Sequence, residues 1–238
     1  MECFNLHNLQ KGSDIMSQIR HENMFFDEYV ENGQLVVELV KCVKTKIEEH
    51  LEIPHTVNGR PVRRIGMAAF RDNKRVKSIK CPDSVGNIYG YAFARCINLE
   101  KFEVYATSEP ASYLNVANNV FEGCEKLSIF RTSVPVRHIG SMAFTKCSAL
   151  ATVDAKVQVL GHKVFAGCDL LSSITIDDNG CWEVDSFIRA KKLKDLHFLG
   201  TINVYKSSLN VVAKKNLHCT DKFNHFELAY EGTRIEIT

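Results

Sequence analysis

"VRRIGMAAFRDNKRVKSIKCP", residues 62–82, contains a phrase that the chain repeats. Related stretches are "VRHIGSMAFTKCSALATV" at 136–153 and "VQVLGHKVFAGCDLLSSI" at 157–174. Aligned on the phenylalanine of the phrase, six copies follow at intervals of 23, 28, 23, 21 and 22 residues, with anchors at Phe70, Phe93, Phe121, Phe144, Phe165 and Phe187. A period of this length indicates a solenoid, because each short unit can bury its apolar face only against its neighbours.

Five columns of this alignment keep their chemical character. Apolar residues recur five positions before the phenylalanine and six and nine positions after it, and cysteine recurs three positions after it in four copies. "LEKFEV" at 99–104 alternates as a short strand does. The "VxxIG" piece predicts a second strand ending at a glycine that can adopt positive φ, and "xxAFxxC" predicts a single helical turn. We therefore expect an α+β repeat.

The repeated phrase resembles a known family. "IGMAAF", "IYGYAFARCINLEKF", "IGSMAFTKCSAL" and "LGHKVFAGCDLL" are similar to the BspA-like (treponemal-type) leucine-rich repeat, and "CPDSV" at 81–85 matches the turn that follows its phrase. "LEIPHTVNGRPVRRIG" at 51–66 is similar to the entry segment of that family. The resemblance covers roughly residues 25–200. It implies a leucine-rich-repeat solenoid and a non-enzymatic adhesion or binding role at a cell surface or in secretion.

We thus expect a right-handed leucine-rich-repeat solenoid of about six to seven coils, built from short strands and single helical turns. Residues 1–24 are expected to form a leader or a short helix, and residues 25–60 a capping β-hairpin and entry segment. "ENG" at 31–33 favours a primed turn in that hairpin. The solenoid should occupy residues 61–200, and residues 201–238 a degenerate last coil and the C-terminal cap.

Composition narrows the functional classes. With 45% hydrophobic and 24% charged residues and a net charge of +2, the chain has the profile of a globular protein. No run of 18 apolar residues predicts membrane insertion. The first 20 residues lack the apolar core of a signal peptide, so a native start at Met1 would predict the cytoplasm. The resemblance implies the cell surface or secretion instead.

The cysteines and histidines predict neither a metal nor a cofactor. Cys96, Cys124, Cys147 and Cys168 share one column, so stacking would place them in a row that cannot surround one tetrahedral ion. Buried free cysteine behaves as a small apolar residue, and core packing is the favoured interpretation. The nucleophile and phosphate-loop motifs of common enzyme families are absent from the sequence. We expect no enzymatic activity.

The first candidate surface is the outward side of the strand column. We call it the strand face, and expect an unidentified protein partner to bind there. The charged residues that this hypothesis assigns to it are Lys77, Lys80, Glu100, Lys101, Glu103, Arg131, Asp154, Lys194 and His197. The 28-residue interval adds five residues within "VYATSEPASYLNV" at 104–116, which predicts a loop carrying Tyr105 and Tyr113 as further contact residues.

The second candidate surface is a basic belt between residues 60 and 80. It contains Arg60, Arg63, Arg64, Arg71, Lys74 and Arg75 besides Lys77 and Lys80, against Asp72 alone. Such a belt could bind an acidic protein or another polyanion. Nucleic acid is disfavoured, because Phe70 is the only aromatic residue in this window and is assigned to the core. A purely architectural spacer is the third interpretation, and the oligomeric state stays open.

Overall fold

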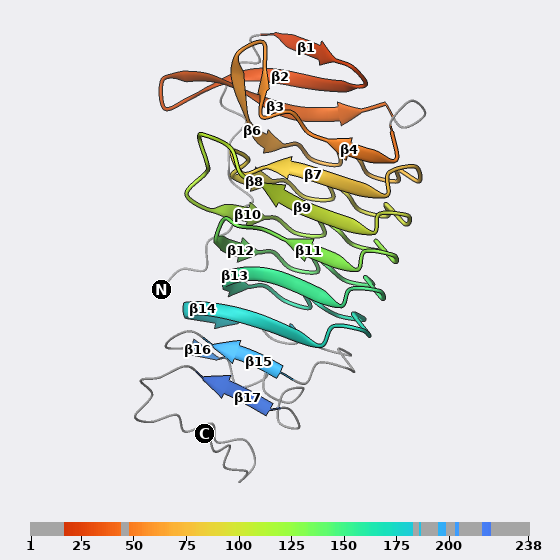
Figure 1. Cartoon of the computed structure of the whole chain (residues 1–238), viewed down its shortest axis with the longest axis vertical. Helices are drawn as coiled ribbons and strands as arrows, with labels where there is room; N and C mark the ends of the chain where they lie inside the picture. Colours follow the sequence, from red (N-terminus) through yellow and green to blue (C-terminus); the bar gives the residue numbers. More distant parts are fainter. Residues whose placement is uncertain are drawn as a thin grey trace.

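The chain folds as a β-solenoid (Figure 1). The computed structural model describes residues 17–43, 48–182, 186, 195–198, 203–204 and 216–219. Five of the six phrases, from the copy at Phe70 to that at Phe165, lie within these residues and form about five turns, whereas most of the phrase at Phe187 lies outside them. Coils stack through parallel strand pairing, which sets a spacing of about 4.8 Å between neighbours.

Each coil contributes two strands, one to each side of the solenoid. The strand face consists of parallel strands that pair in sequence order: β4 (His50–Glu52), β7 (Ser78–Pro82), β9 (Lys101–Tyr105), β11 (Ile129–Arg131), the start of β13 (Thr152–Leu160), β14 (Ser173–Trp182), β15 (Asp195–Phe198) and β17 (Asn216–Cys219). The opposite side holds β6 (Arg60–Ile65), β8 (Asn87–Ile88), β10 (Leu114–Val116), β12 (Val136–Ile139), the ends of β13 and β14, and β16 (Asn203–Val204). We call the part formed by β8, β10, β12 and residues 157–160 of β13 the back face.

A hairpin caps the N-terminal end, as predicted. β2 (Met24–Glu31) pairs antiparallel with β3 (Gln34–Cys42), and β3 continues into the solenoid by pairing parallel with β6. Asn32 and Gly33 have φ values of 51° and 80°, the two positive values of a type I′ turn. A second hairpin joins β5 (Thr56–Val57) to β6.

The structure differs from the helix expected near the N-terminus. A leader or a short helix was expected over residues 1–24, but Gln18–His21 forms strand β1, which pairs antiparallel with β2. Pairing with the exposed edge of β2 satisfies backbone groups that a separate helical segment would leave facing the sheet. Residues 1–16 of this segment lie outside the described residues.

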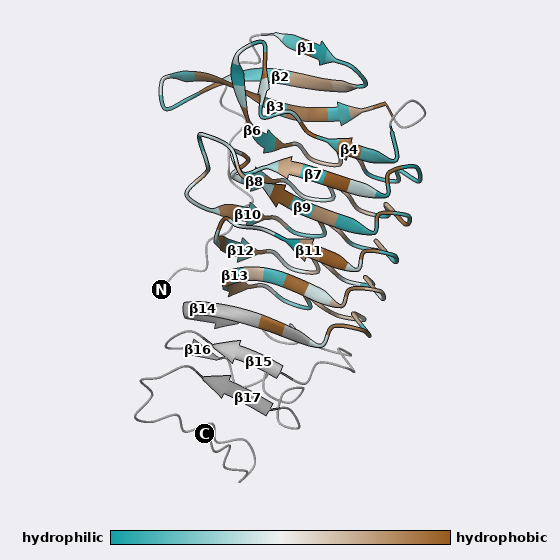
Figure 2. Ribbon diagram, in the orientation of Figure 1, coloured by the Kyte–Doolittle hydropathy of each residue, from teal (hydrophilic) through white to brown (hydrophobic). Residues whose placement is uncertain are grey.

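The core consists of the predicted columns. All five described phrase phenylalanines are fully buried, and their rings stack from coil to coil with centroids 4.9–5.5 Å apart. A second column, with Phe102 and Phe130 at its centre, packs edge-on against the first. Apolar and polar segments alternate along the strands of the strand face, so one side chain in two turns inward (Figure 2).

The cysteine column is also buried, and its thiols have a defined role. Cys96, Cys124, Cys147 and Cys168 each donate a hydrogen bond to the carbonyl of the phenylalanine in the preceding phrase, at 3.1–3.2 Å. Burial raises the pKa of the Cys168 thiol to about 12, so it remains the protonated donor. The six cysteines whose side chains the structure describes are free and buried. These thiols therefore satisfy core carbonyls.

The expected helical turns are wrong, and with them the α+β assignment. The described residues contain strands and turns but no helix. Two residues before and two residues after each phenylalanine the backbone has positive φ, at Ala68 and Asp72, Tyr91 and Arg95, Asn119 and Gly123, Met142 and Lys146, and Lys163 and Gly167. A helix of L-residues excludes this alternation. Alternate N–H groups, such as those of Phe70 and Asp72, instead donate to carbonyls of the next coil at 2.7 and 2.9 Å.

Candidate functional site

The strand face presents its charged residues in register. In the register of the parallel strands, Lys80 lies opposite Glu52 on one side and Glu103 on the other, and Arg131 lies opposite Glu103 and Asp154. Parallel pairing thus brings residues 23–28 positions apart in the sequence into one row, Glu52–Lys80–Glu103–Arg131–Asp154. The charge alternates along this row at every coil.

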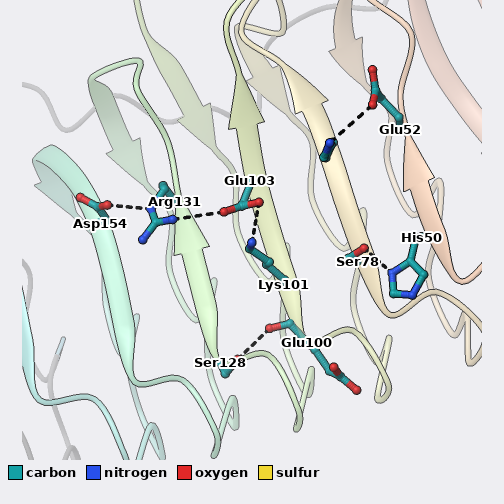
Figure 3. Close-up of polar contacts among 10 residues, drawn as sticks. His50, Glu52, Ser78, Glu100, Lys101, Glu103, Ser128, Arg131 and Asp154 are labelled. Atoms are coloured by element: carbon teal, nitrogen blue, oxygen red, sulfur yellow. Dashed lines mark hydrogen bonds and ion pairs between the residues drawn. The ribbon is translucent and has the colours of Figure 1, made fainter.

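Three of the four adjacent pairs in this row, all but Lys80 with Glu103, form ion pairs in the described structure (Figure 3). Arg131 Nε lies 2.8 Å from Asp154 Oδ2, and another nitrogen of the same guanidinium lies 3.3 Å from Glu103 Oε1. The ammonium of Lys101 reaches Glu103 at 2.8 Å, and that of Lys80 lies 3.9 Å from Glu52. These side chains are exposed or partly exposed, so each pair contributes at most about 1 kcal/mol. Their main effect is to hold one another in fixed positions.

A second set of contacts borders the row. Lys77 Nζ lies 2.7 Å from Glu49 Oε2, and this ammonium lowers the pKa of the Glu49 carboxyl. His50 Nδ1 lies 2.8 Å from Ser78 Oγ, and Ser128 Oγ donates to the carbonyl of Glu100 at 3.0 Å (Figure 3). The face therefore carries five carboxylates and four cations from Glu49 to Asp154 and is nearly neutral.

The contact between His50 and Ser78 lacks the other parts of a nucleophilic centre. β7 lies between β4 and β9, so its backbone N–H groups are used in the ladder and cannot form an oxyanion hole. In the described part of the chain, no three His, Cys, Asp or Glu side chains are arranged to hold a metal ion. The side chains of this face offer hydrogen-bonding and charged groups.

The first coil of this face was not predicted from the sequence. Glu49, His50 and Glu52 belong to it, although no full phrase precedes them. The available signal was the offset of 28 residues from Leu51 to Ile79, which equals the offset from Phe102 to Phe130. At the other end, Lys194 lies outside the described residues, and His197 is placed by its backbone in β15, in register with Thr175.

The inserted loop is held against the two preceding coils. The hydroxyl of Tyr105 donates to the carbonyl of Ile53 at 2.9 Å, so this ring anchors the loop and is not free for a partner. Thr107 donates its backbone N–H to Asp83 at 2.8 Å. Tyr113 is 42% exposed and remains a candidate contact residue.

The basic belt does not form one positive surface, because its members lie on three sides of the coil. Arg60, Arg63 and Arg64 lie on β6; Arg71, Lys74 and Arg75 lie in the turns after Phe70; Lys77 and Lys80 lie beside and on β7. Lys77 is paired with Glu49, directly before β4, and Lys80 with Glu52 of β4. Arg71 lies 3.8 Å from Asp72 and stacks over Tyr91, with its guanidinium carbon 5.2 Å from the ring centroid.

The arginines of β6 hold structural elements together. Arg60 pairs with the buried Glu28 of β2, Arg63 pairs with Glu109 of the inserted loop at 3.4 Å, and Arg64 pairs with Glu31 of the capping hairpin at 2.7 Å. The Arg64 guanidinium carbon also lies 3.9 Å from the centroid of the Tyr29 ring. These contacts attach the cap and the loop to the first coil, so the arginines of β6 have a structural role.

The junction between the cap and the first coil contains a destabilised carboxyl. Glu38 of β3 lies beside Gly66, where a Cβ would come within 2.7 Å of Glu38 Oε1. Burial raises the pKa of Glu38, Arg64 opposes the shift, and Asp27 adds to it. The folded state therefore binds a proton here more tightly than the unfolded chain.

We expect Glu38→Gln to stabilise the protein at neutral pH by about 0.5–1 kcal/mol. A raised pKa contributes stability that is present below the ordinary glutamate pKa and is lost as pH rises through the folded pKa. Glutamine removes this loss, so the gap between variant and wild type should shrink toward pH 4 in urea unfolding followed by circular dichroism. A gap that widens at low pH would contradict the assignment. Glu100→Gln, on the exposed strand face, is the matched control.

Comparisons with known proteins give a family and a fold. The sequence profile described as "BspA type Leucine rich repeat region" matches residues 44–170 and 105–214, with six copies. No curated protein matches the sequence significantly. Within the described residues, no helix is long and apolar enough to cross a membrane.

Three solved bacterial structures are similar to this chain. A leucine rich cell surface protein from Faecalibacterium prausnitzii shares 20% identity with a TM-score of 0.51, covering 86% of this chain and 45% of that one. The Treponema pallidum leucine rich repeat protein shares 20% identity (TM-score 0.47; 72% and 68% covered), and a leucine-rich repeat protein from Bacteroides ovatus shares 18% (0.48; 84% and 70%). At these identities the likeness concerns the fold alone.

Proposed function

Because this chain belongs to the BspA type leucine-rich repeat family, we propose that it is a non-enzymatic, adhesin-like binding module whose strand face holds a protein partner. The observation that carries the proposal is the charged row from Glu52 to Asp154, in which ion pairs join Lys80 to Glu52 and Arg131 to both Glu103 and Asp154. Side chains that are ordered before binding lose less conformational entropy when a partner docks. The row is therefore a surface whose paired side chains are ordered before a partner binds.

The charge pattern defines the kind of partner. The acids Glu49 and Glu52 precede the two lysines Lys77 and Lys80. A net negative charge follows at Glu100, Lys101 and Glu103, then a positive one at Arg131 and a negative one at Asp154. A partner with the complementary alternation would be selected, because a shift by one coil places like charges opposite each other. The near-neutral sum argues against general attraction of polyanions to this face.

The proposal includes location at a cell surface. The Faecalibacterium prausnitzii protein is described as residing there, and adhesin-like function requires it. This location takes precedence over the cytoplasmic one predicted from the N-terminal residues. Surface labelling of intact native cells with an impermeant reagent, followed by fractionation, tests it: labelling only after lysis would contradict it.

The test of the strand face is a double charge reversal. Lys77→Glu with Lys80→Glu should weaken partner binding at least about tenfold, because both exposed ammonium groups become carboxylates beside Glu49 and Glu52. Neither side chain belongs to the core, so the fold should survive with a loss of about 1 kcal/mol. Wild type and variant, immobilised at equal density, are exposed to a surface extract of the native host, and retained proteins are quantified by mass spectrometry and then measured singly by surface plasmon resonance.

The matched control is Lys126→Glu with Lys146→Glu. Both lysines are exposed, lie outside the strand face and give the same charge change. A partner retained by wild type and control but lost from Lys77→Glu with Lys80→Glu supports the proposal. Equal loss from both double variants would indicate diffuse electrostatic attraction and would overturn it, as would retention by all three.

A further inference from the structure

The back face differs from the strand face in that it carries no carboxylate. Its described segments, residues 87–88, 114–116, 136–139 and 157–160, contain neither Asp nor Glu. They contribute Asn87, Asn115, Arg137, His138 and Gln158 instead, and the exposed Lys156 lies directly before residue 157. Basic and amide groups are therefore gathered on this side without the acids that neutralise the strand face.

A bulge directs one arginine toward the inserted loop. Between β10 and β12 the register shifts after the pair Leu114–Val136, and Asn115 pairs with His138, so that Arg137 has no Cα partner in β10. Bulges of this kind change the direction of a side chain. The Arg137 guanidinium carbon lies 5.3 Å from the centroid of the Tyr113 ring. Arg137 is exposed and, in the described part of the chain, forms no ion pair.

The stacked pair is held on a rigid support. Arg63 donates to the backbone carbonyl of Glu109 at 3.1 Å and pairs with its carboxylate, and Asp83 holds Thr107. These contacts fix the loop before Tyr113, and Leu114 enters β10 directly after it. The carboxylate of Glu109 is thereby engaged by Arg63. Tyr113 presents an aromatic ring in a fixed place on the solvent side.

Two asparagines continue this surface along the solenoid axis. Asn115 Nδ2 donates to Asn87 Oδ1 at 3.1 Å and to the carbonyl of Gly86 at 3.4 Å. With the amides assigned from this hydrogen bond, the Asn87 NH₂ group and the Asn115 side-chain carbonyl remain available to a ligand. One donor and one acceptor in adjacent coils, about 4.8 Å apart, match hydroxyl groups, which both donate and accept.

We propose that the back face beside the inserted loop binds an acidic polysaccharide, a chain of sugars that bears carboxylates. Tyr113 would stack on a sugar ring, the Asn87–Asn115 pair would bind hydroxyls, and Arg137 and Lys156 would pair with carboxylates. Charge complementarity favours a carboxylated sugar chain over a neutral one, because the back-face strands contain no acid. The aromatic ring and the amides favour sugar over a simple anion. This site is separate from the strand face and does not depend on the protein partner proposed there.

The test uses native gels that contain defined polysaccharides. Polygalacturonate and hyaluronan carry carboxylates, heparin carries sulfates as well, and dextran is neutral. We expect the full chain to be retarded by at least one of the two carboxylated polymers and not by dextran. Tyr113→Ala and Arg137→Ala should each weaken the apparent affinity at least tenfold, with the fold checked by circular dichroism.

The chain offers a matched pair of controls, because Tyr91 with Arg71 forms the same stacked arrangement in another part of the surface. Tyr91→Ala and Arg71→Ala should leave the retardation unchanged. Absence of retardation by both carboxylated polymers, retardation by dextran alone, or an equal effect of the two variant pairs would overturn the proposal. Binding to heparin only, weakened equally by Arg137→Ala and Arg71→Ala, would show diffuse charge attraction and would also overturn it.

Discussion

Phe144→Ala is expected to lower the free energy of unfolding by about 3–5 kcal/mol. Phe144 is fully buried in a central coil, stacked between Phe121 at 5.1 Å and Phe165 at 5.5 Å, with Phe130 edge-on at 5.1 Å. Truncation removes these ring contacts and leaves a cavity. Neighbouring coils cannot collapse into it, because backbone hydrogen bonds between the coils fix their spacing. The Phe144 N–H, for example, donates to the Val164 carbonyl at 3.0 Å. The loss should therefore lie at the upper end of the range.

Urea unfolding followed by far-UV circular dichroism measures this loss. Phe144→Leu keeps most of the volume and should lose about 1.5 kcal/mol. Tyr113→Ala removes an exposed ring and should change stability by about 0.5 kcal/mol. If Phe144→Ala unfolded like Tyr113→Ala, the aromatic column would not be the core of the solenoid.

Gly140→Ala should destabilise the protein by about 3 kcal/mol, the upper end of the usual cost of overpacking. A Cβ at this position would lie 2.6 Å from the backbone carbon of Ala117 and from the backbone nitrogen of Asn118. Both atoms belong to the preceding coil, and Gly140 N–H is bonded to Val116 of that coil at 2.7 Å. Asn118 Oδ1 would also lie 2.5 Å away, but moving that side chain leaves the two backbone contacts in place, so the added methyl group must push two coils apart.

Gly86→Ala is the control for this substitution. Its Cβ would make ordinary contacts at 3.5 Å, so its stability should change by less than about 1 kcal/mol. Gly140→Asn separates two explanations for the repeated glycine. Asparagine tolerates positive φ, so it would be accepted if backbone conformation were the reason, whereas close approach predicts a loss at least as large as that of alanine. The free energies of unfolding of the three variants, measured by thermal and urea unfolding, distinguish these two explanations.

The recurrence of apolar residues in the same columns of successive repeats predicted the core correctly. Apolar residues at fixed distances from each phrase phenylalanine turned out to be buried, from Ile65 and Val76 in the first phrase to Leu160 and Leu171 in the last described one. The hairpin with Asn32 and Gly33 was also predicted correctly. Both results rest on local patterns, because burial follows the strand period and a primed turn needs only two residues that accept positive φ.

The turns were predicted wrongly because two conformations bury the same residues. Alanine, phenylalanine and cysteine at the spacing of "AFxxC" fit one face of a helical turn. They fit equally a segment whose backbone alternates between left-handed and right-handed conformations, with positive φ at Ala68 and Asp72, for example. The choice is made by hydrogen bonds to the next coil, such as Phe93 N–H to the Val120 carbonyl at 2.9 Å, which repay the cost of left-handed φ. These partners are 27 residues apart and no local pattern shows them.

The glycine of "IG" was assigned to a strand end that can adopt positive φ, which is also wrong. Gly66, Gly140 and Gly161 do not have positive φ. A Cβ at each would come within 2.5–2.7 Å of its neighbour, which is strand β3 of the cap for Gly66 and the preceding coil for the other two. The repeated phrase indicated that glycine is needed there. Only the stacked structure shows that the reason is the closeness of neighbouring backbones.

By itself, the sequence determined that the chain is a stack of similar coils with an aromatic core and a hairpin cap. Only the tertiary structure decided which charges meet: the belt from Arg60 to Lys80 is divided among three sides, Lys80 joins Glu52, and Arg137 is turned toward Tyr113. Burial is set by periods of a few residues, which a single sequence displays. The ion pairs of Arg131 with Asp154 and of Arg63 with Glu109 join residues 23 and 46 positions apart, and such contacts depend on the length of every intervening coil and on each bulge.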